Sequence, residues 1–234
     1  MQAIIVAAGE GRRLSPLTKD RPKALLEVQG QSLISRSVGL LMDAGISDLA
    51  LVVGYRKEML MDHLADYPVT FHFNPFYRIT NNMASLWFAR SFVREDFLYL
   101  HSDLIYDPRL LHQLVDSGQP DTLLVERKAC ASEEMKVTVK DARLVASSKE
   151  IPLTEAFGEW TGLARFSPSF GGILFDRIGA LIEDGHLMAY DTFAFTELAK
   201  EGHAIGITAF TDLPWVEIDT PDDLQLARRL FESG

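Results

Sequence analysis

Cysteine is scarce in this sequence, and its scarcity excludes several classes of protein. Cys130 is the one cysteine among 234 residues, so neither an internal disulfide framework nor a cysteine-rich zinc site can form within the chain. This usage is typical of a reduced intracellular protein in which the thiol is incidental. We therefore expect a cytoplasmic protein and no catalytic cysteine.

Long hydrophobic runs are also missing. No run approaches the roughly 20 apolar residues that a membrane helix needs, and the opening apolar stretch is too short for the apolar region of a signal peptide. Positive charge is scarce as well, because 23 Lys and Arg stand against 33 Asp and Glu, which gives a formal net charge of −10. This balance argues against nucleic acid or an anionic membrane as the partner.

What is present is the pattern of one α/β domain over residues 1–234, without linker, repeat or low-complexity tract. Apolar strands alternate with helical periodicity up to residue 100, which predicts a mostly parallel sheet with helices on both faces. Past Pro120, shorter runs alternate apolar and polar residues and predict antiparallel strands with one solvated face. The predicted strands are 2–6, 49–53, 69–73, 97–100, 122–126, 136–139, 143–147, 205–210 and 215–218, and the predicted helices are 32–44, 57–65, 83–93, 168–183, 192–201 and 221–231.

The first strand runs directly into glycines and cations. Residues 7–11 are Ala-Ala-Gly-Glu-Gly, then come Arg12 and Arg13, and a proline-rich turn leads to Lys23. Small residues let backbone N–H groups approach a phosphate closely, and cations neutralise its charge. The segment therefore predicts a polyphosphate site. Arg13 and Lys23 are fixed relative to the glycine turn and to Pro22, whereas we expect Arg12 to be a solvated bystander.

This segment differs from two well-known phosphate loops. Leu14 stands where the dinucleotide fingerprint has its third glycine, which disfavours an oxidoreductase. No Gly-Lys-Ser/Thr follows the glycines, so the segment is not a Walker loop either.

The segment instead resembles the signature of the nucleotidyltransferase superfamily that makes activated sugars and alcohols. The residues that carry the resemblance are Ala-Ala-Gly-Glu-Gly-Arg-Arg-Leu at 7–14, Pro-Leu-Thr at 16–18 and Pro-Lys-Ala-Leu at 22–25. The resemblance implies an α/β fold of three Rossmann-like layers, with a mostly parallel central sheet and a small antiparallel subregion that binds the acceptor. By match, Arg13 and Lys23 would be catalytic, binding the phosphates and stabilising charge during transfer. The loop that wraps the nucleotide would include Ala7, Ala8, Gly9 and Gly11.

Two aspartates follow predicted strands that lie far apart in the sequence. Asp103 comes after the strand 97–100, and Asp219 precedes the C-terminal helix. Open α/β sheets bind ligands at their carboxyl edge, and Mg²⁺ prefers one or two carboxylates. The alternatives are a solvated turn residue at 103 and a helix N-cap at 219. The resemblance favours the metal, because the family uses an Asp after this strand and an Asp in a C-terminal Glu-x-Asp-like segment as its Mg²⁺ pair.

The motif Asn-Asn-x-x-Ser-Leu at 81–86 resembles the branch of phosphocholine, aminoethylphosphonate and related cytidylyltransferases. This implies CTP as the donor and a small phosphate or phosphonate monoester as the acceptor. Asn82 and Ser85 would read the cytosine edge; the equal alternative is that Asn82 caps the following helix. Lys149 matches a family lysine that grips the acceptor phosphate, and the alternative is an exposed lysine at a strand end.

A cationic head group on the acceptor would be met by aromatic and acidic side chains. Trp160 is a candidate for an aromatic cage, and Glu159 or Asp191 would pair with an amine, while core packing is the alternative for most aromatic residues. The sequence leaves open which acceptor is used. It also leaves the oligomeric state open, a homo-oligomer included.

Three other functions are weighed against this one. A hexose-1-phosphate nucleotidylyltransferase that uses UTP or dTTP shares the signature. A nucleotide-sugar glycosyltransferase shares the fold type, but residues 101–103 carry one carboxylate where its Asp-x-Asp motif has two. A catalytically silent nucleotide-binding subunit is disfavoured, because the four matched charged residues are all retained. No Ser-His-Asp or Cys-His arrangement is expected, since transfer of this type relies on positioning and charge stabilisation.

Overall fold

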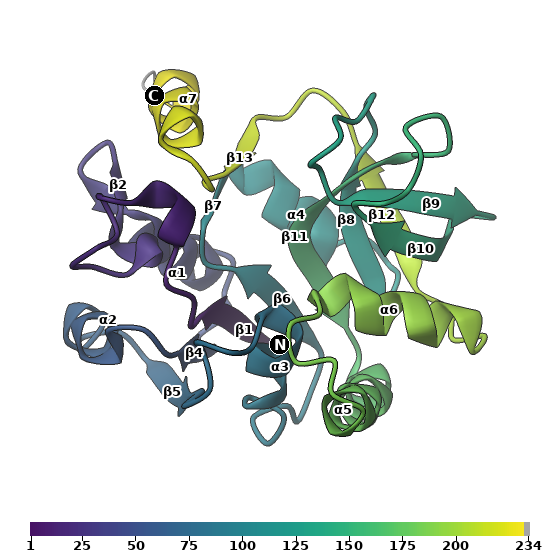
Figure 1. The fold of residues 1–234 in the computed structure, drawn as a ribbon, viewed down its shortest axis with the longest axis horizontal. Coiled ribbons are helices and arrows are strands. Elements are labelled where there is room, and N and C mark those ends of the chain that lie inside the picture. Colours follow the sequence, from purple (N-terminus) through teal and green to yellow (C-terminus); the bar gives the residue numbers. More distant parts are fainter. Residues whose placement is uncertain (232–234) are drawn as a thin grey trace.

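The computed structural model describes residues 1–231 and places a mixed sheet of nine strands between two layers of helices (Figure 1). The strands are β1 (Gln2–Ala7), β2 (Glu27–Val28), β3 (Gln31–Ser32), β4 (Asp48–Val53), β5 (Val69–Phe73), β6 (Phe97–His101), β7 (Leu104–Tyr106), β8 (Thr122–Glu126), β9 (Lys136–Lys140), β10 (Arg143–Ser148), β11 (Gly158–Phe166), β12 (Gly206–Phe210) and β13 (Trp215–Glu217). The helices are α1 (Leu33–Asp43), α2 (Lys57–His63), α3 (Asn82–Trp87), α4 (Pro108–Val115), α5 (Pro168–Glu183), α6 (Asp191–Lys200) and α7 (Pro221–Phe231), with 3₁₀ turns at Arg12–Leu14 and Lys23–Leu25.

The large sheet has a parallel half and a mostly antiparallel half. Its order is β5-β4-β1-β6-β11-β8-β12-β10-β9, and the first four strands run parallel to one another. β11 is antiparallel to both β6 and β8 and joins the two halves. A further pairing between β11 and β9 closes the last five strands on themselves.

The period-two alternation of the buried strands sorts their side chains between the two helical layers. Ile4 and Val6 of β1 pack in the core that contains α3, α5 and α6. Ile5 and Ala7 of the same strand pack in the core that contains α1, α2 and α4. The expected three-layer α/β architecture is therefore confirmed, and it places the carboxyl ends of β1 and β6 at one edge of the sheet.

Several elements differ from the sequence prediction. The helix predicted at 83–93 ends as α3 at Trp87, because the chain continues in tight turns in which the amides of Ala89 and Phe92 donate to the carbonyls three residues earlier. The apolar side chains of these turns are buried and produce the helical periodicity without a helix. The sequence prediction missed the strands β2, β3, β7 and β11 and the helix α4.

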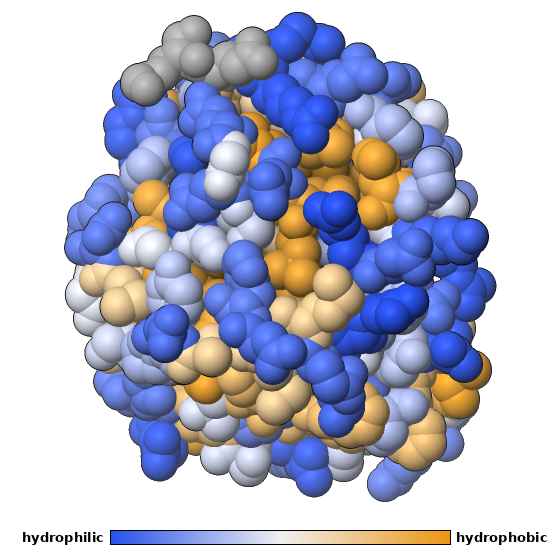
Figure 2. Space-filling view, turned by 90° about the vertical axis from the view of Figure 1, so that its left-hand side faces the viewer, coloured by the Kyte–Doolittle hydropathy of each residue, from blue (hydrophilic) through white to orange (hydrophobic). Residues whose placement is uncertain are grey.

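Within residues 1–231 no helix combines the length and the apolar character that a membrane span requires. On one face of the molecule hydrophobic side chains line a central hollow bordered by hydrophilic ones, and further hydrophobic side chains lie along the lower part of that face (Figure 2).

Candidate active site

A cleft of about 780 Å³ opens at the carboxyl ends of β1 and β6 and extends over β8 and β11. Its lining includes the glycine-rich loop after β1, the segment 101–103 after β6, and residues from β11 and from the loop after β8. Every residue predicted for the site lines this cleft except Ser85.

Glycine is required in the loop after β1. Gly11 has a φ of +61°, and a Cβ at this position would lie 3.1 Å from Cβ of Lys23. The Thr18 hydroxyl donates to the carbonyl of Gly11 at 2.8 Å. The loop is thus folded back on itself, and this conformation brings Lys23 next to the glycine turn.

Lys23 lies between the two predicted metal ligands. Its Nζ donates to Asp103 Oδ2 at 2.7 Å and to Asp219 Oδ1 at 2.6 Å. Arg13 reaches the other oxygen of Asp219 at 2.6 Å. Arg12 instead pairs with Glu10 at 2.6 Å, and its side chain is largely exposed.

A short ribbon of strands brings the two aspartates together. β7 and β13 pair antiparallel, with Leu104 opposite Glu217, and the Ile218 amide donates to the carbonyl of Asp103 at 2.9 Å. The adjoining Asp219 therefore faces the end of β6.

The capping of α7 is done by other residues. The Thr220 hydroxyl accepts from the Asp223 amide at 3.3 Å, and the Asp223 carboxylate accepts from the Thr220 amide at 2.7 Å. This reciprocal arrangement is a capping box. The carboxylate of Asp219 is thereby left to the two cations, so the N-cap alternative for this residue is wrong.

The charges of this cluster shift one another's ionisation. Burial alone would lower the pKa of Lys23, but the carboxylates of Asp103 and Asp219 raise it above its usual value. Burial alone would raise the pKa of Asp103, but the Lys23 ammonium holds it below its usual value. Lys23 and Asp103 are therefore both charged at neutral pH. Oδ1 of Asp103 is buried and has no hydrogen-bond partner among the described residues, which leaves one carboxylate oxygen available to a cation.

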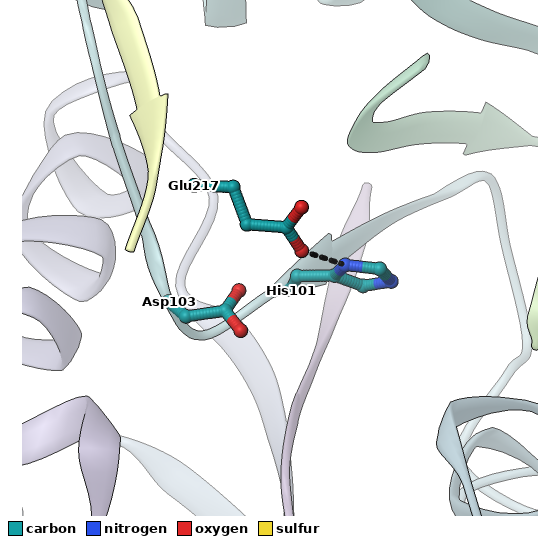
Figure 3. Close-up of side chains that lie close together, drawn as sticks. All are labelled: His101, Asp103 and Glu217. Atoms are coloured by element: carbon teal, nitrogen blue, oxygen red, sulfur yellow. Dashed lines mark ion pairs between the residues drawn. The ribbon is translucent and has the colours of Figure 1, made fainter. Parts of the chain in front are cut away.

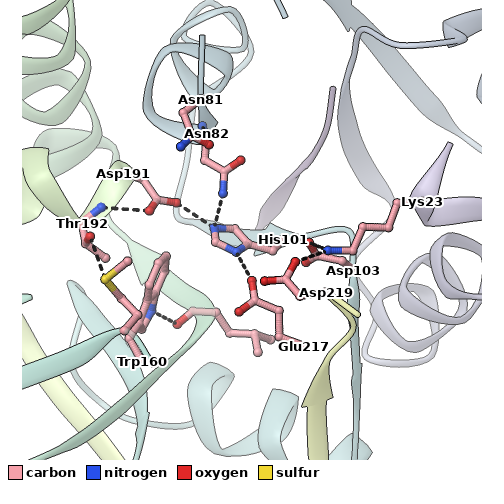
Figure 4. A network of polar contacts seen from close by, with 12 residues as sticks. Lys23, Asn81, Asn82, His101, Asp103, Trp160, Asp191, Thr192, Glu217 and Asp219 are labelled. Carbon is pink, nitrogen blue, oxygen red and sulfur yellow. Dashed lines mark hydrogen bonds and ion pairs between the residues drawn. The ribbon is translucent and has the colours of Figure 1, made fainter. Parts of the chain in front are cut away.

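His101 links this cluster to the rest of the cleft (Figure 4). Its Nε2 donates to Asp191 Oδ2 at 2.7 Å, and its Nδ1 lies 3.6 Å from Glu217 Oε1. Burial alone would lower the pKa of His101, but the carboxylates of Asp191 and Glu217 raise it well above its usual value. Gly162 of β11, with a φ of +79°, makes room for the ring, since a Cβ there would lie 3.0 Å from Nδ1.

His101, Asp103 and Glu217 bring three side chains of types that can bind a metal close together (Figure 3). One ligand atom from each lies within 4.8 Å of the others. Sequence reasoning did not single out His101 or Glu217. The available signal was their spacing, because each lies two residues before a predicted metal ligand and so points to the same side of an extended chain.

The residues predicted for the acceptor occupy different environments. Lys149 Nζ lies 4.0 Å from Glu133 and 5.8 Å from the centre of the Tyr190 ring. Glu159 pairs with Lys128 at 2.6 Å. Lys149 therefore faces the cleft, and Glu159 already has a cationic partner.

Asp191 and Trp160 are held inside the protein. Asp191 accepts hydrogen bonds from the Tyr99 hydroxyl, from His101 and from the Thr192 amide, so its oxygens are already in use. Trp160 lines the cleft but is buried, donates to the Leu163 carbonyl and packs against Tyr99 and His101.

Of the two residues predicted to read a cytosine, one lies outside the cleft. Ser85 is buried, and its hydroxyl donates to the Asn81 carbonyl and accepts from the Asn74 amide. Asn82 lines the cleft, and the cap of α3 is Asn81, whose side chain accepts from the Asn82 amide at 2.9 Å. The capping alternative for Asn82 is therefore wrong, and Ser85 supports the helix end.

The chain matches a known family and several curated proteins. The model of the MobA-like NTP transferase domain matches residues 3–190. The "Bifunctional IPC transferase and DIPP synthase" of Aquifex aeolicus is 29% identical over 97% of this chain and 51% of that protein. The CMP-5'-(3-aminopropyl)phosphonate synthase of Streptomyces rubellomurinus is 28% identical over 97% of this chain and 38% of that protein. The CTP:phosphoglutamine cytidylyltransferase of Campylobacter jejuni is 28% identical over 97% of this chain and 98% of that protein. The chain thus spans about half or less of the first two relatives and almost all of the third.

Solved structures share the fold along the whole chain. The CTP:phosphocholine cytidylyltransferase from Streptococcus pneumoniae superposes with a TM-score of 0.81 at 24% identity and covers 98% of both chains. The inositol-1-phosphate CTP transferase from T. maritima superposes with a TM-score of 0.80 at 23% identity and covers 99% of this chain and 96% of the other. At these identities the likeness shows the fold.

Proposed function

Since the chain belongs to the family of MobA-like NTP transferase domains, it is a nucleotidyltransferase, and we propose that it is a Mg²⁺-dependent cytidylyltransferase. It transfers CMP from CTP to a small phosphate or phosphonate monoester and releases pyrophosphate. Relatives named for cytidylyl transfer differ in the acceptor, which is phosphoglutamine in one case and an aminoalkyl phosphonate in another. The chemistry common to them is a phosphorus acceptor with a short polar or charged tail.

One observation carries this proposal. The ammonium of Lys23 bridges Asp103 and Asp219, and Arg13 joins the same cluster beside the glycine-rich loop. Cations that bind phosphate and carboxylates that bind a divalent cation are thereby gathered at one point of the cleft. A nucleoside triphosphate chelated to a metal ion needs both.

The donor set fits Mg²⁺. Asp103 and Asp219 supply hard carboxylate oxygens, and Oδ1 of Asp103 has no other partner among residues 1–231. Members of the family generally use a divalent metal ion. When bound by Asp103 and Asp219, Mg²⁺ would neutralise charge on the phosphates, which lowers the barrier to transfer.

The reaction needs no covalent intermediate on the protein. An oxygen of the acceptor phosphate attacks the α-phosphorus of CTP, and the bond from that phosphorus to the oxygen bridging to the β-phosphorus breaks. Pyrophosphate leaves with the electron pair of that bond. Arg13 and Lys23 bind the phosphates and stabilise the charge that develops on the leaving group. The loop that contains Ala7, Ala8, Gly9 and Gly11 wraps the nucleotide. Asn82 is the side chain that we assign to the cytosine.

The acceptor binds on the side of the cleft formed by β8, β11 and the loop between β8 and β9. Lys149 is the cation that we assign to its phosphate or phosphonate, because it lines the cleft and its nearest carboxylate is 4.0 Å away. Glu159 and Trp160 border the space for the tail of the acceptor. Asp191 acts through His101, which it holds by a hydrogen bond of 2.7 Å.

The test is a screen for pyrophosphate release that crosses CTP, UTP, dTTP and ATP with phosphocholine, phosphoethanolamine, 2-aminoethylphosphonate, glycerol phosphate and glucose 1-phosphate. We expect release with CTP and a small acceptor, loss with EDTA and recovery with Mg²⁺. Preference for UTP or dTTP with the sugar phosphate would instead establish a hexose-1-phosphate nucleotidylyltransferase. Nucleotide binding without release from any pair would establish a silent subunit.

A further inference from the structure

A second charged cluster lies in the acceptor half of the cleft, apart from the cluster around Lys23. Lys128 Nζ is 2.6 Å from Glu159, 3.0 Å from Glu134 and 3.5 Å from Glu126. It also lies 5.8 Å from the centre of the Trp215 ring, whose Nε1 donates to Glu126 at 2.9 Å. One ammonium is thus surrounded by three carboxylates and an aromatic face, which is the environment that binds an organic cation.

The backbone imposes this concentration of negative charge. Glu126 of β8 and Glu159 of β11 stand directly opposite each other in an antiparallel pair. Like charges in that position repel and destabilise the pairing unless a cation lies between them. Glu159 has only a tenth of its side-chain surface exposed, and burial, opposed by Lys128 and reinforced by Glu134, raises its pKa to about 7.

The loop that carries Lys128 and Glu134 is held in place by hydrogen bonds from the side chain of Lys136. Lys136, a fully buried lysine, donates from Nζ to the carbonyl of Ser132 at 2.7 Å and to that of Glu134 at 3.3 Å. The second carboxylate oxygen of Glu134 accepts from the Ala131 amide at 2.7 Å. The carboxylates around Lys128 therefore have a fixed geometry, unlike a solvated ion pair on the surface.

We propose that Lys128 is a specificity-determining residue that occupies the cation subsite of the acceptor. An acceptor with a positively charged tail must displace this ammonium from the carboxylates, whereas an acceptor with a neutral tail does not. Lys128 thereby disfavours cationic acceptors relative to neutral ones of the same size. The assignment to acceptor choice rests on the proposed function, but the binding of a cation at this cluster does not.

The test replaces Lys128 with methionine, which keeps the length of the side chain and removes its charge. Assays at pH 8.5 keep Glu159 ionised when its cationic partner is lost. Relative to the wild type, we expect the KM for phosphocholine in Lys128→Met to fall about tenfold. The variant lacks the charge-assisted contacts between Lys128 and the carboxylates, so the positive tail of the acceptor no longer has to displace them. The KM for glycerol phosphate and the KM for CTP should change less than about twofold. Lys128→Arg keeps the charge and should keep the wild-type preference, and Lys140→Met, at an exposed lysine, is the matched surface control.

Binding of choline chloride by calorimetry, without nucleotide or phosphate, separates this inference from the proposed function. Tighter choline binding by Lys128→Met than by the wild type supports the cation subsite even if CTP proves not to be the donor. Equal or weaker binding by a folded Lys128→Met overturns it. If Lys128→Met folds poorly, Lys128→Ala is titrated with choline while the melting temperature is followed. A rise that the wild type does not show supports the subsite, and no rise overturns it.

Discussion

On the side of β1 the cleft is lined by cations from one continuous segment, residues 12–23, whereas on the side of β8 and β11 it is lined by carboxylates from three separate segments. The cations are held by a loop whose glycines, proline and hydrogen bonds are local. The carboxylates meet only because β8 and β11 pair in a particular register. The end around Arg13 and Lys23, which we propose binds the phosphates and call the phosphate end, is therefore encoded by neighbouring residues. The end around Glu126, Lys128 and Glu159, which we propose binds the acceptor and call the acceptor end, is encoded by the topology of the sheet.

The largest effect should come from Lys23 at the phosphate end. Lys23→Met removes the charge that we assign to the phosphates and leaves Asp103 and Asp219 without their shared cation. We expect turnover to fall by about 10²- to 10³-fold, as for the loss of one group that stabilises transition-state charge. Steady-state pyrophosphate release measures it. Lys19→Met, at an exposed lysine of the same loop, is the control, and an equal loss in both variants would mean that the loop tolerates no change at all.

Two adjacent arginines sharpen the comparison within that loop. Arg13 reaches Asp219 in the cluster, while Arg12 pairs with Glu10. Arg13→Ala should lower kcat/KM for CTP by about 10- to 100-fold, in the range of a charge-assisted contact, and Arg12→Ala by less than about threefold. The reverse order would assign the phosphate to Arg12 and contradict the site described here.

At the acceptor end the expected effects are smaller and depend on pH. Burial raises the pKa of Glu159 to about 7, with Lys128 opposing and Glu134 and Glu217 adding to the rise. The carboxyl is therefore neutral below this pH and charged above it, so an acceptor with a positive tail should bind better as pH rises from 6 to 8. We expect the KM ratio of phosphocholine to glycerol phosphate to fall about threefold over this range. Because both acceptors are phosphate monoesters, the titration of the acceptor phosphate affects both KM values and cancels in their ratio.

Glu159→Gln provides the control for that pH dependence. Its KM ratio should be flat between pH 6 and 8, because the amide does not titrate. A ratio that falls as steeply in the variant as in the wild type would assign the pH dependence to another group.

Since burial raises the pKa of Glu159, its ionisation also works against folding above the unfolded value near 4.5. The variant should therefore lose less stability than the wild type when pH is raised from 6 to 8.

The smallest effect on activity should come from Thr220, which caps α7 beside Asp219. Thr220→Ala removes the hydroxyl of the capping box and should lower the free energy of unfolding by about 1 kcal/mol. Activity should stay within about twofold of the wild type, because the hydrogen bonds of the Thr220 hydroxyl are made to Asp223 and not to Lys23 or Arg13. Urea unfolding followed by circular dichroism measures the first quantity. A loss of activity as large as in Asp219→Asn would mean that the cap and the charge cluster are not separable.

The contrast between features encoded by neighbouring residues and features that depend on strand pairing explains how much of the molecule could be predicted from the sequence. The parallel strands of the first half follow from unbroken apolar runs, and Arg13 and Lys23 follow from a local motif. β11 escaped prediction because it contains Gly158 and Gly162, which usually indicate turns. In this strand they allow close approaches, since a Cβ at Gly158 would lie 2.1 Å from the Glu126 carbonyl oxygen. Helix α4 did carry a signal, the cap Asp107 followed by Pro108.

The acceptor end was less predictable, for a physical reason. Glu126 and Glu159 are 33 positions apart in the sequence, and the residues that flank each of them do not indicate that the two stand opposite each other. Asp191 and Ser85 were assigned to ligands because they are polar, and the fold uses their hydrogen bonds for its own structure.

β11 also determines what kind of motion this protein can use. Its residues 163–166 are hydrogen-bonded to β6 in the parallel half, and its residues 158–160 to β8 and β9 in the other half. A hinge between the two halves would have to break these ladders within a single nine-residue strand. A rigid-body hinge between the two halves would therefore disrupt backbone pairing in β11. We expect movements during turnover in the loops that border the cleft, where no such pairing has to break.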